Sequence, residues 1–176
     1  MGDEQAKTIE ALQFAIQMEI DGKAYYQKAG KTSGTRMGKE LYQWLASEED
    51  RHRQRFEQIY EAIRKNQAWP EAAIEPSGVN ELNNIFANAR GASVPKSKRQ
   101  SAELKSIATA MEMENKTERF YKEQGEKARH PVERKFYESL AAEERGHYLA
   151  LVDYREYLVD PAGWFRKAEH HSLDGG

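Results

Sequence analysis

The chain has 176 residues, enough for one domain with a substantial core, and its 27 basic and 29 acidic residues give a formal net charge of −2. This balance argues against a nucleic-acid partner, and the lack of any run of about 20 apolar residues argues against a membrane partner. The 176 residues contain no cysteine, which excludes disulfides, thiolate-bound zinc, iron–sulfur clusters and a rubredoxin-type iron centre among them.

The chain opens with a predicted helical hairpin. Its first residues, MGDEQAK, lack the apolar core of a signal peptide, so we expect a cytoplasmic protein. The residues that follow are rich in helix formers such as Ala, Glu, Lys and Gln, and they predict one helix over about 4–30 and a second over about 36–66. Gly30 and the Thr-Ser-Gly segment 32–34 mark the turn between the two helices.

The composition changes over residues 67–98, which include three prolines, two glycines and several asparagines. We interpret this segment as a long crossover, of the kind that connects two hairpins in some four-helix bundles. One short helical pattern lies within the crossover, from Asn80 to Arg90. The residues on its single apolar face are Leu82, Ile85, Phe86 and Ala89.

A second predicted hairpin follows the crossover. Its helices cover about 99–128 and about 131–158, with a turn at His130-Pro131, because proline suits the first turn of a helix. We therefore expect an all-α fold in which two hairpins form a four-helix bundle with one short extra helix.

Residues 1–160 are predicted to form the domain, and residues 161–176 a C-terminal tail. His170 and His171 lie in this tail and could bind a metal or dock on the bundle. We favour the interpretation that they belong to a polar, frayed chain end.

The second hairpin repeats the first at an offset of 95 residues, with no gap across the turn. The matching pairs include Ala15 with Ala110, Glu19 with Glu114, Tyr26 with Tyr121, Tyr42 with Tyr137, Leu45 with Leu140, Glu49 with Glu144, and His52 with His147. This repeat predicts that the two hairpins pack about a pseudo-twofold axis.

Each half contains one Glu-x-x-His motif, and a lone glutamate precedes each motif by 30 residues. The six residues are Glu19, Glu49 and His52 in the first half and Glu114, Glu144 and His147 in the second. Residues three apart on a helix share one face, and all six interrupt the apolar stripes that should face the core. One such motif would most often be a surface pair, but two copies on core stripes at one offset predict metal ligands.

Charge balance indicates how many metals the site holds. Four buried, unpaired carboxylates would be strongly destabilising, and two divalent cations would neutralise their four charges. We expect each metal to bind one histidine and one terminal glutamate, Glu19 or Glu114, with Glu49 and Glu144 as bridges. Carboxylate and imidazole ligands favour iron or manganese, and zinc is an alternative.

Five other residues lie near the predicted ligands. Tyr26 and Tyr121 follow Glu19 and Glu114 by about two helical turns, and they are either hydrogen-bonding or electron-relay residues of the site or core tyrosines. Glu48 and Glu143 adjoin ligands, and we expect them to make outer contacts or surface pairs. Glu118, which has no glutamate as its counterpart in the first half, is predicted to lie on a solvated face.

These motifs resemble those of the rubrerythrin family of ferritin-like proteins over about residues 8–158. The segments that carry the resemblance are Ala15-Ile16-x-x-Glu19, Leu45-Ala46-x-Glu48-Glu49-x-x-His52, Ala110-Met111-x-x-Glu114 and Leu140-Ala141-x-Glu143-Glu144-x-x-His147, with Tyr25-Tyr26 and Phe120-Tyr121. The resemblance implies a ferritin-like bundle around a non-haem di-iron centre, in a homodimer. It also implies the family's activity, which is the reduction of hydrogen peroxide to water in protection against oxidative stress.

Two features differ from the family pattern. The family's rubredoxin domain has no counterpart among these cysteine-free residues, and Thr117 occupies the position of an additional glutamate. We therefore expect a di-iron oxidoreductase that reduces hydrogen peroxide or dioxygen, with the six ligands as its reactive site. Its electrons would come from an external donor such as a rubredoxin-like protein. The alternatives are a ferroxidase or iron-handling protein, and a metal-stabilised module without turnover.

Overall fold

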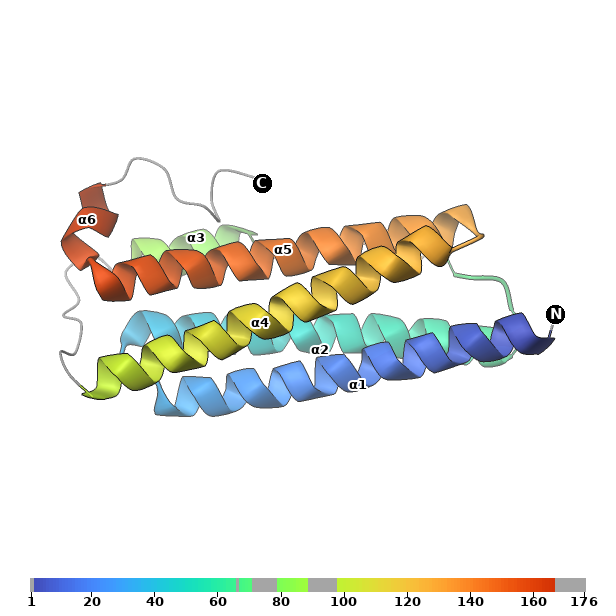
Figure 1. Ribbon diagram of the computed structural model, residues 1–176, viewed down its shortest axis with the longest axis horizontal. Coiled ribbons are helices and arrows are strands. Elements are labelled where there is room, and N and C mark those ends of the chain that lie inside the picture. The colour runs from blue at the N-terminus through green and yellow to red at the C-terminus, as the bar shows by residue number, and fades with distance from the viewer. Residues whose placement is uncertain (1, 66, 71–78, 89–97, 167–176) are drawn as a thin grey trace.

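The computed structural model describes residues 2–65, 67–70, 79–88 and 98–166, and within these ranges the chain is helical with no strand (Figure 1). The elements are α1 (Gly2–Thr32), α2 (Arg36–Arg64), α3 (Val79–Ala87), α4 (Lys98–Lys127), α5 (Pro131–Val159) and α6 (Pro161–Arg166). The four long helices lie alongside one another, and α1 packs most closely on α2 and α4 on α5. The all-α, ferritin-like bundle predicted from the sequence is confirmed.

The turn residues explain where the helices begin. The Thr35 hydroxyl accepts a hydrogen bond from the Gly38 backbone N–H (2.9 Å) and caps α2. At the other hairpin, His130 Nδ1 accepts from the Val132 N–H (3.3 Å), and Pro131 occupies the first turn of α5. Both turns lie where Gly, Ser and Pro in the sequence predict them.

The core consists of two apolar clusters with a layer of charged residues between them. On α1, Ala15 belongs to one cluster and Tyr26 to the other, and the buried Glu19 lies between them along the helix. On α2, Leu45 and Phe56 belong to the two clusters in the same way. The position of Glu19 and its counterparts is therefore the middle of the bundle. None of the described helices is long and apolar enough to cross a membrane.

Two short helices cover one end of the bundle. The short crossover helix predicted around Leu82 is present as α3, whereas Ala89 and Arg90 lie outside the described residues. Residues 161–166 form α6, and Trp164 packs on Phe86 of α3, with the ring centroids 5.7 Å apart. His170 and His171 lie outside the described residues, so their assignment to a polar tail stays a prediction.

Candidate metal centre

All six predicted ligands lie in the buried layer at the middle of the bundle, and each long helix supplies at least one. Their exposed fractions are 0% for Glu19, 5% for Glu49, 0% for His52, 2% for Glu114, 0% for Glu144 and 1% for His147. Charged side chains are almost never buried this fully unless they are paired or bind a metal. The packing of four helices has therefore gathered four carboxylates and two imidazoles in one dry volume.

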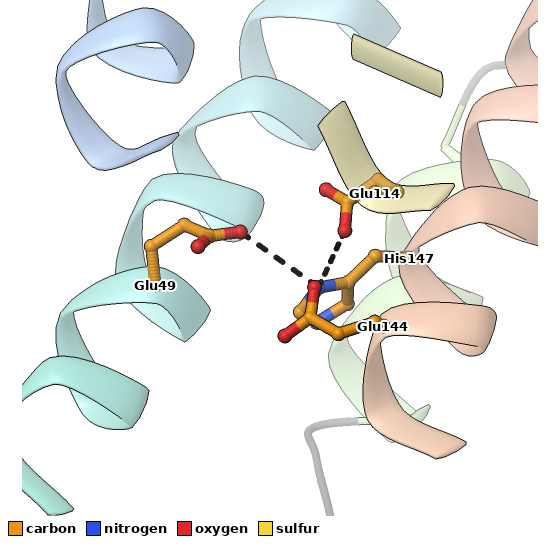
Figure 2. A group of neighbouring side chains, drawn as sticks. All are labelled: Glu49, Glu114, Glu144 and His147. Atoms are coloured by element: carbon orange, nitrogen blue, oxygen red, sulfur yellow. Dashed lines mark ion pairs between the residues drawn. The ribbon is translucent and has the colours of Figure 1, made fainter. Parts of the chain in front are cut away.

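The six residues form two adjoining groups. Glu49, Glu114, Glu144 and His147 each offer one ligand atom, and these atoms lie within 4.8 Å of one another (Figure 2). Glu19, Glu49 and His52 form a second group by the same measure. Because Glu49 belongs to both groups, the arrangement provides two neighbouring positions for cations that share a carboxylate.

Glu144 also lies between the two histidines. Its Oε1 is 3.0 Å from Nδ1 of His52, and its Oε2 is 3.5 Å from Nδ1 of His147. By contrast, Glu19 lies 3.6 Å from His52, and Glu114 lies 3.6 Å from His147. Glu49 and Glu144 thus occupy the central positions expected of bridges, and Glu19 and Glu114 the flanking positions expected of terminal ligands.

The electrostatics of the six groups are those of a site built for cations. Burial, together with the neighbouring carboxylates, raises the pKa of Glu49 well above its usual range and the pKa of Glu114 to about 8. Burial opposes the charged form of the histidines, but the surrounding glutamates outweigh it and raise the pKa of His147 to about 9 and that of His52 well above 6.5. Burial also opposes ionisation of Glu144, yet both histidines lower its pKa.

The raised pKa values of Glu49, Glu114, His52 and His147 all favour the protonated forms of these groups, so protons can offset the carboxylate charge in place of cations. Several buried ligand atoms nevertheless make no hydrogen bond of suitable geometry among the described residues, although some lie close to an oppositely charged group. They are Glu19 Oε2, Glu114 Oε2, both carboxylate oxygens of Glu144, and Nδ1 of His52 and His147. These atoms converge on one volume, so the donor set fits a pair of divalent cations.

Tyr26 and Tyr121 connect the two hairpins at the site. The hydroxyl of Tyr26 donates a hydrogen bond to Glu114 Oε1, and that of Tyr121 donates to Glu19 Oε1. Each tyrosine therefore holds the terminal glutamate of the other hairpin and leaves the second carboxylate oxygen facing the cluster. Of the two interpretations of these tyrosines, the structure confirms hydrogen bonding at the site.

The two histidines differ in what lies behind them. His52 donates from Nε2 to Glu143 Oε2 (2.9 Å), and Arg55 holds the same carboxylate at 3.2 Å. Glu143 is thus an outer contact, as predicted. His147 Nε2 has no partner among the described residues, and the ring of Trp44 packs against the imidazole edge-on at 5.4 Å between centroids.

Glu48, the counterpart of Glu143 in the repeat, makes a different outer contact. Its side chain is 1% exposed, and it forms an ion pair with Arg51 on the same helix. Glu48 was expected to make an outer contact or a surface pair; it does form an ion pair, but its carboxylate is buried and does not lie on the surface.

Sequence reasoning missed Gly22 and misplaced Glu118. A Cβ at Gly22 would lie 2.9 Å from Glu49 Oε2, so the glycine makes room for the central carboxylate. A helix-interior glycine eight residues before a turn signal such as Gly30 was a usable clue, because glycine is unfavourable there. Glu118 was predicted to be solvated, and this is wrong. It is 8% exposed and pairs with Lys122 in the groove between α4 and α5.

A family model described as Rubrerythrin matches residues 10–153, a range that includes all six clustered residues. No curated protein and no solved structure matches the chain. The matched range covers most of the sequence and includes all of α2 and α4 and the greater part of α1 and α5. The chain belongs to the rubrerythrin family.

Proposed function

We propose that the protein is a non-haem di-iron oxidoreductase that reduces hydrogen peroxide to water with electrons from an external donor. The observation that carries the proposal is the pair of buried ligand groups that share Glu49, with Glu144 between the two histidines. Oxygen and imidazole ligands in two adjoining sets suit a pair of iron ions. Bound there, the two irons would supply two electrons and Lewis acidity for cleavage of the O–O bond.

The chain's own residues hold and orient the ligands. Glu143 accepts the Nε2 proton of His52, which fixes the tautomer that directs Nδ1 at the cluster. The hydroxyls of Tyr26 and Tyr121 fix Glu114 and Glu19 in the same manner. This preorganisation means that the ligand set needs little rearrangement when metal binds.

The surroundings of the cluster suit a small oxidant. The six ligands are almost completely buried, so bulk water is kept away from the reacting atoms. A surface groove of about 630 Å³ lies between α1 and α2, and Tyr26 is among its lining residues. Tyr26 also contacts Glu114, so one side chain adjoins both the groove and the cluster.

A ferroxidase is the second candidate, and Thr117 favours it. The Thr117 hydroxyl donates to the Met113 carbonyl (3.1 Å), so this side chain supplies no additional carboxylate to the cluster. A set of four glutamates and two histidines is the ligand set of a general ferritin-like oxidase centre. In that case Fe(II) would be a substrate, oxidised at the site and passed on.

Stopped-flow oxidation of the anaerobically reduced, iron-loaded protein separates the two functions. We expect hydrogen peroxide to oxidise the reduced protein faster than dioxygen does, and turnover to require an added donor because the 176 residues hold no thiolate-bound iron. A clear preference for dioxygen with accumulation of ferric iron would favour the ferroxidase. Inertness toward both oxidants would leave a metal-stabilised module.

A further inference from the structure

A chain of aromatic side chains leads from the metal centre to the end of the bundle that α6 covers. Tyr26 stacks on Tyr42 (6.1 Å between centroids, 23° between planes), and Tyr42 meets Tyr154 edge-on at 6.0 Å. Tyr154 stacks on Tyr157 at 6.4 Å, and Tyr157 meets Trp164 at 5.7 Å. All five rings are at most 4% exposed. Tyrosine and tryptophan are the side chains that most readily lose an electron, so the chain is a continuous path for electron transfer.

Tyr154 has a proton acceptor that the fold holds in place. Its hydroxyl donates to Glu103 Oε1 (2.8 Å), and Glu103 also accepts hydrogen bonds from the Ser33 hydroxyl (2.6 Å) and the Gly34 backbone N–H (2.9 Å). Glu103 is 7% exposed and lies 11 residues before Glu114 on α4, roughly 16 Å along the helix. The Tyr154–Glu103 pair is therefore separate from the metal ligands.

Such an acceptor matters because a tyrosine that loses an electron also loses its phenolic proton. Tyr154 donates to Glu103, so the end of the path that lies away from the metal centre has a proton acceptor outside the ligand set. The hydroxyl of Tyr42 has no partner among the described residues. Tyr42 is therefore suited to pass an electron between its neighbours without keeping the charge. Burial raises the pKa of the Tyr154 phenol above its usual value, so the group is protonated before oxidation.

The repeat shows that the Tyr154–Glu103 pair is an addition to one end of the bundle. Tyr26 and Tyr42 recur as Tyr121 and Tyr137, whose centroids are 6.1 Å apart. At the offset of 95 residues, however, Tyr154 corresponds to Ile59, and Glu103 corresponds to Thr8. The buried tyrosine with a fixed carboxylate is thus not a by-product of the duplicated scaffold.

We propose that Tyr154 is a redox-active tyrosine that supplies an electron to the metal centre, through Tyr42 and Tyr26, when the external donor has not delivered one. This role rests on the proposed peroxide reduction. Peroxide needs two electrons, and Tyr154 supplies the second when the metal pair has only one to give.

The transfer balances in electrons and protons. Tyr26 passes an electron to the metal pair and is restored by an electron that Tyr154 supplies through Tyr42, so Tyr26 keeps its phenolic proton overall. Tyr154 loses its own phenolic proton to Glu103 Oε1. The net result is one electron delivered to the metal pair, a neutral radical on Tyr154 and a neutral acid at Glu103. A reductant can return the electron through Trp164, which contacts the partly exposed Phe165 (5.1 Å, 38% exposed).

The first test is electron paramagnetic resonance of the iron-loaded chain, reduced by one electron per metal pair and frozen after one equivalent of peroxide. We expect a tyrosyl signal that is lost in Tyr154→Phe and is weakened or lost in Glu103→Gln, which removes the acceptor. Tyr148→Phe is the matched control, since Tyr148 lies outside the path, and it should keep the signal. A signal that survives Tyr154→Phe, or a tryptophanyl signal lost in Trp44→Phe, would overturn the proposal.

The second test removes peroxide chemistry by loading the chain with zinc, which does not change its oxidation state. Azide radicals generated by pulse radiolysis oxidise tryptophan, and a tryptophanyl signal at Trp164 should convert to a tyrosyl signal at a rate independent of protein concentration. Loss of this conversion in Tyr154→Phe and in Trp164→Phe supports the path even if peroxide is not the substrate. Unchanged conversion in Tyr154→Phe contradicts it.

Discussion

The two halves of the candidate metal centre have the same predicted ligands but different surroundings. Behind His52, Glu143 accepts the outer imidazole proton and is held by Arg55. Behind His147, the repeat places Glu48 and Ala150 at the corresponding positions, and Glu48 pairs with Arg51 instead. Trp44 packs on His147 where the other half has a polar partner. The duplicated scaffold preserves the ligands, whereas their outer contacts have diverged.

A second difference concerns the space around the two central glutamates. On α1, Gly22 leaves room for Glu49, and the corresponding position on α4 is Thr117, whose hydroxyl bonds to the Met113 carbonyl. Partners behind a ligating histidine orient the ring and raise its basicity. The two candidate metal positions therefore have different surroundings, and we expect the His52 half to hold its metal more firmly.

Removal of a central glutamate should have the largest effect, because Glu49 and Glu144 serve both halves. We expect Glu144→Ala and Glu49→Ala each to abolish binding of a metal pair while the helical circular dichroism signal persists. Elemental analysis after dialysis measures the metal content. A variant that retains two metals and full activity would show that its glutamate is not a ligand, and the two halves would then be independent sites.

The metal-free protein should become less stable as the pH rises from about 5 to about 9. In the folded chain the pKa of Glu114 is about 8 and that of His147 about 9, against ordinary values of 4.5 and 6.5. The folded state therefore binds more protons than the unfolded state across this window, and its stability falls as those protons leave. The lowered pKa of Glu144 changes the stability of the protein only at pH values below this window.

Melting curves with chelator and with saturating metal check this expectation. The metal-loaded protein should not lose stability over the same window, because cations replace the protons and metal binding releases them. A metal-free protein whose melting temperature is constant from pH 5 to pH 9 would mean that the two groups are not buried together.

The outer contacts provide a matched pair of variants. Glu143→Gln should weaken metal binding in the His52 half by about 10–100-fold, the usual effect of losing such a partner. Glu48→Gln, at the corresponding position of the other half, should leave metal affinity almost unchanged because Glu48 contacts Arg51. Competition titrations with a chelator of known affinity measure both variants. Equal effects of the two substitutions would contradict the inequivalence of the halves.

Gly22→Ala should give the smallest effect. It also distinguishes most clearly between an effect on the stability of the fold and an effect on the metal site. The new Cβ would lie 2.9 Å from Glu49 Oε2, so the carboxylate must shift, while the helix gains roughly 0.5–1 kcal/mol from replacing glycine. We expect a smaller rise in melting temperature on metal addition, with no loss of metal-free stability. Gly146→Ala is the control, since its Cβ would meet nothing within 4 Å. If both variants respond equally to metal, Gly22 has no role at the site.

The sequence located the buried cluster because its residues repeat. Two Glu-x-x-His motifs at one offset, on stripes that must face a core, point to Glu49 and Glu144, and the structure places both in the buried layer. The long helices were predicted for a related reason, since Gly30 and Pro131 interrupt otherwise continuous helix formers. Internal repeats, and glycine or proline residues that end helices, can both be recognised in a single sequence.

The remaining site residues do not repeat, and this is why they were missed. Arg55 and Trp44 correspond to Ala150 and Ser139, and whether each reaches a histidine depends on how the two hairpins cross, which no local pattern records. Glu118 was predicted to be solvated because charge on a helix usually is, but its position in the α4–α5 groove buries it beside Lys122. Residues 161–166 were predicted to belong to the C-terminal tail because a segment of six residues is too short to show a helical pattern.

Anomalous diffraction from crystals of the metal-loaded protein tests the central claim most directly. We predict two peaks per chain, about 3.5–4 Å apart, with Glu49 and Glu144 between them and His52 and His147 on either side. A single peak in the cluster, or metal found only at His170 and His171, would contradict the two-metal centre.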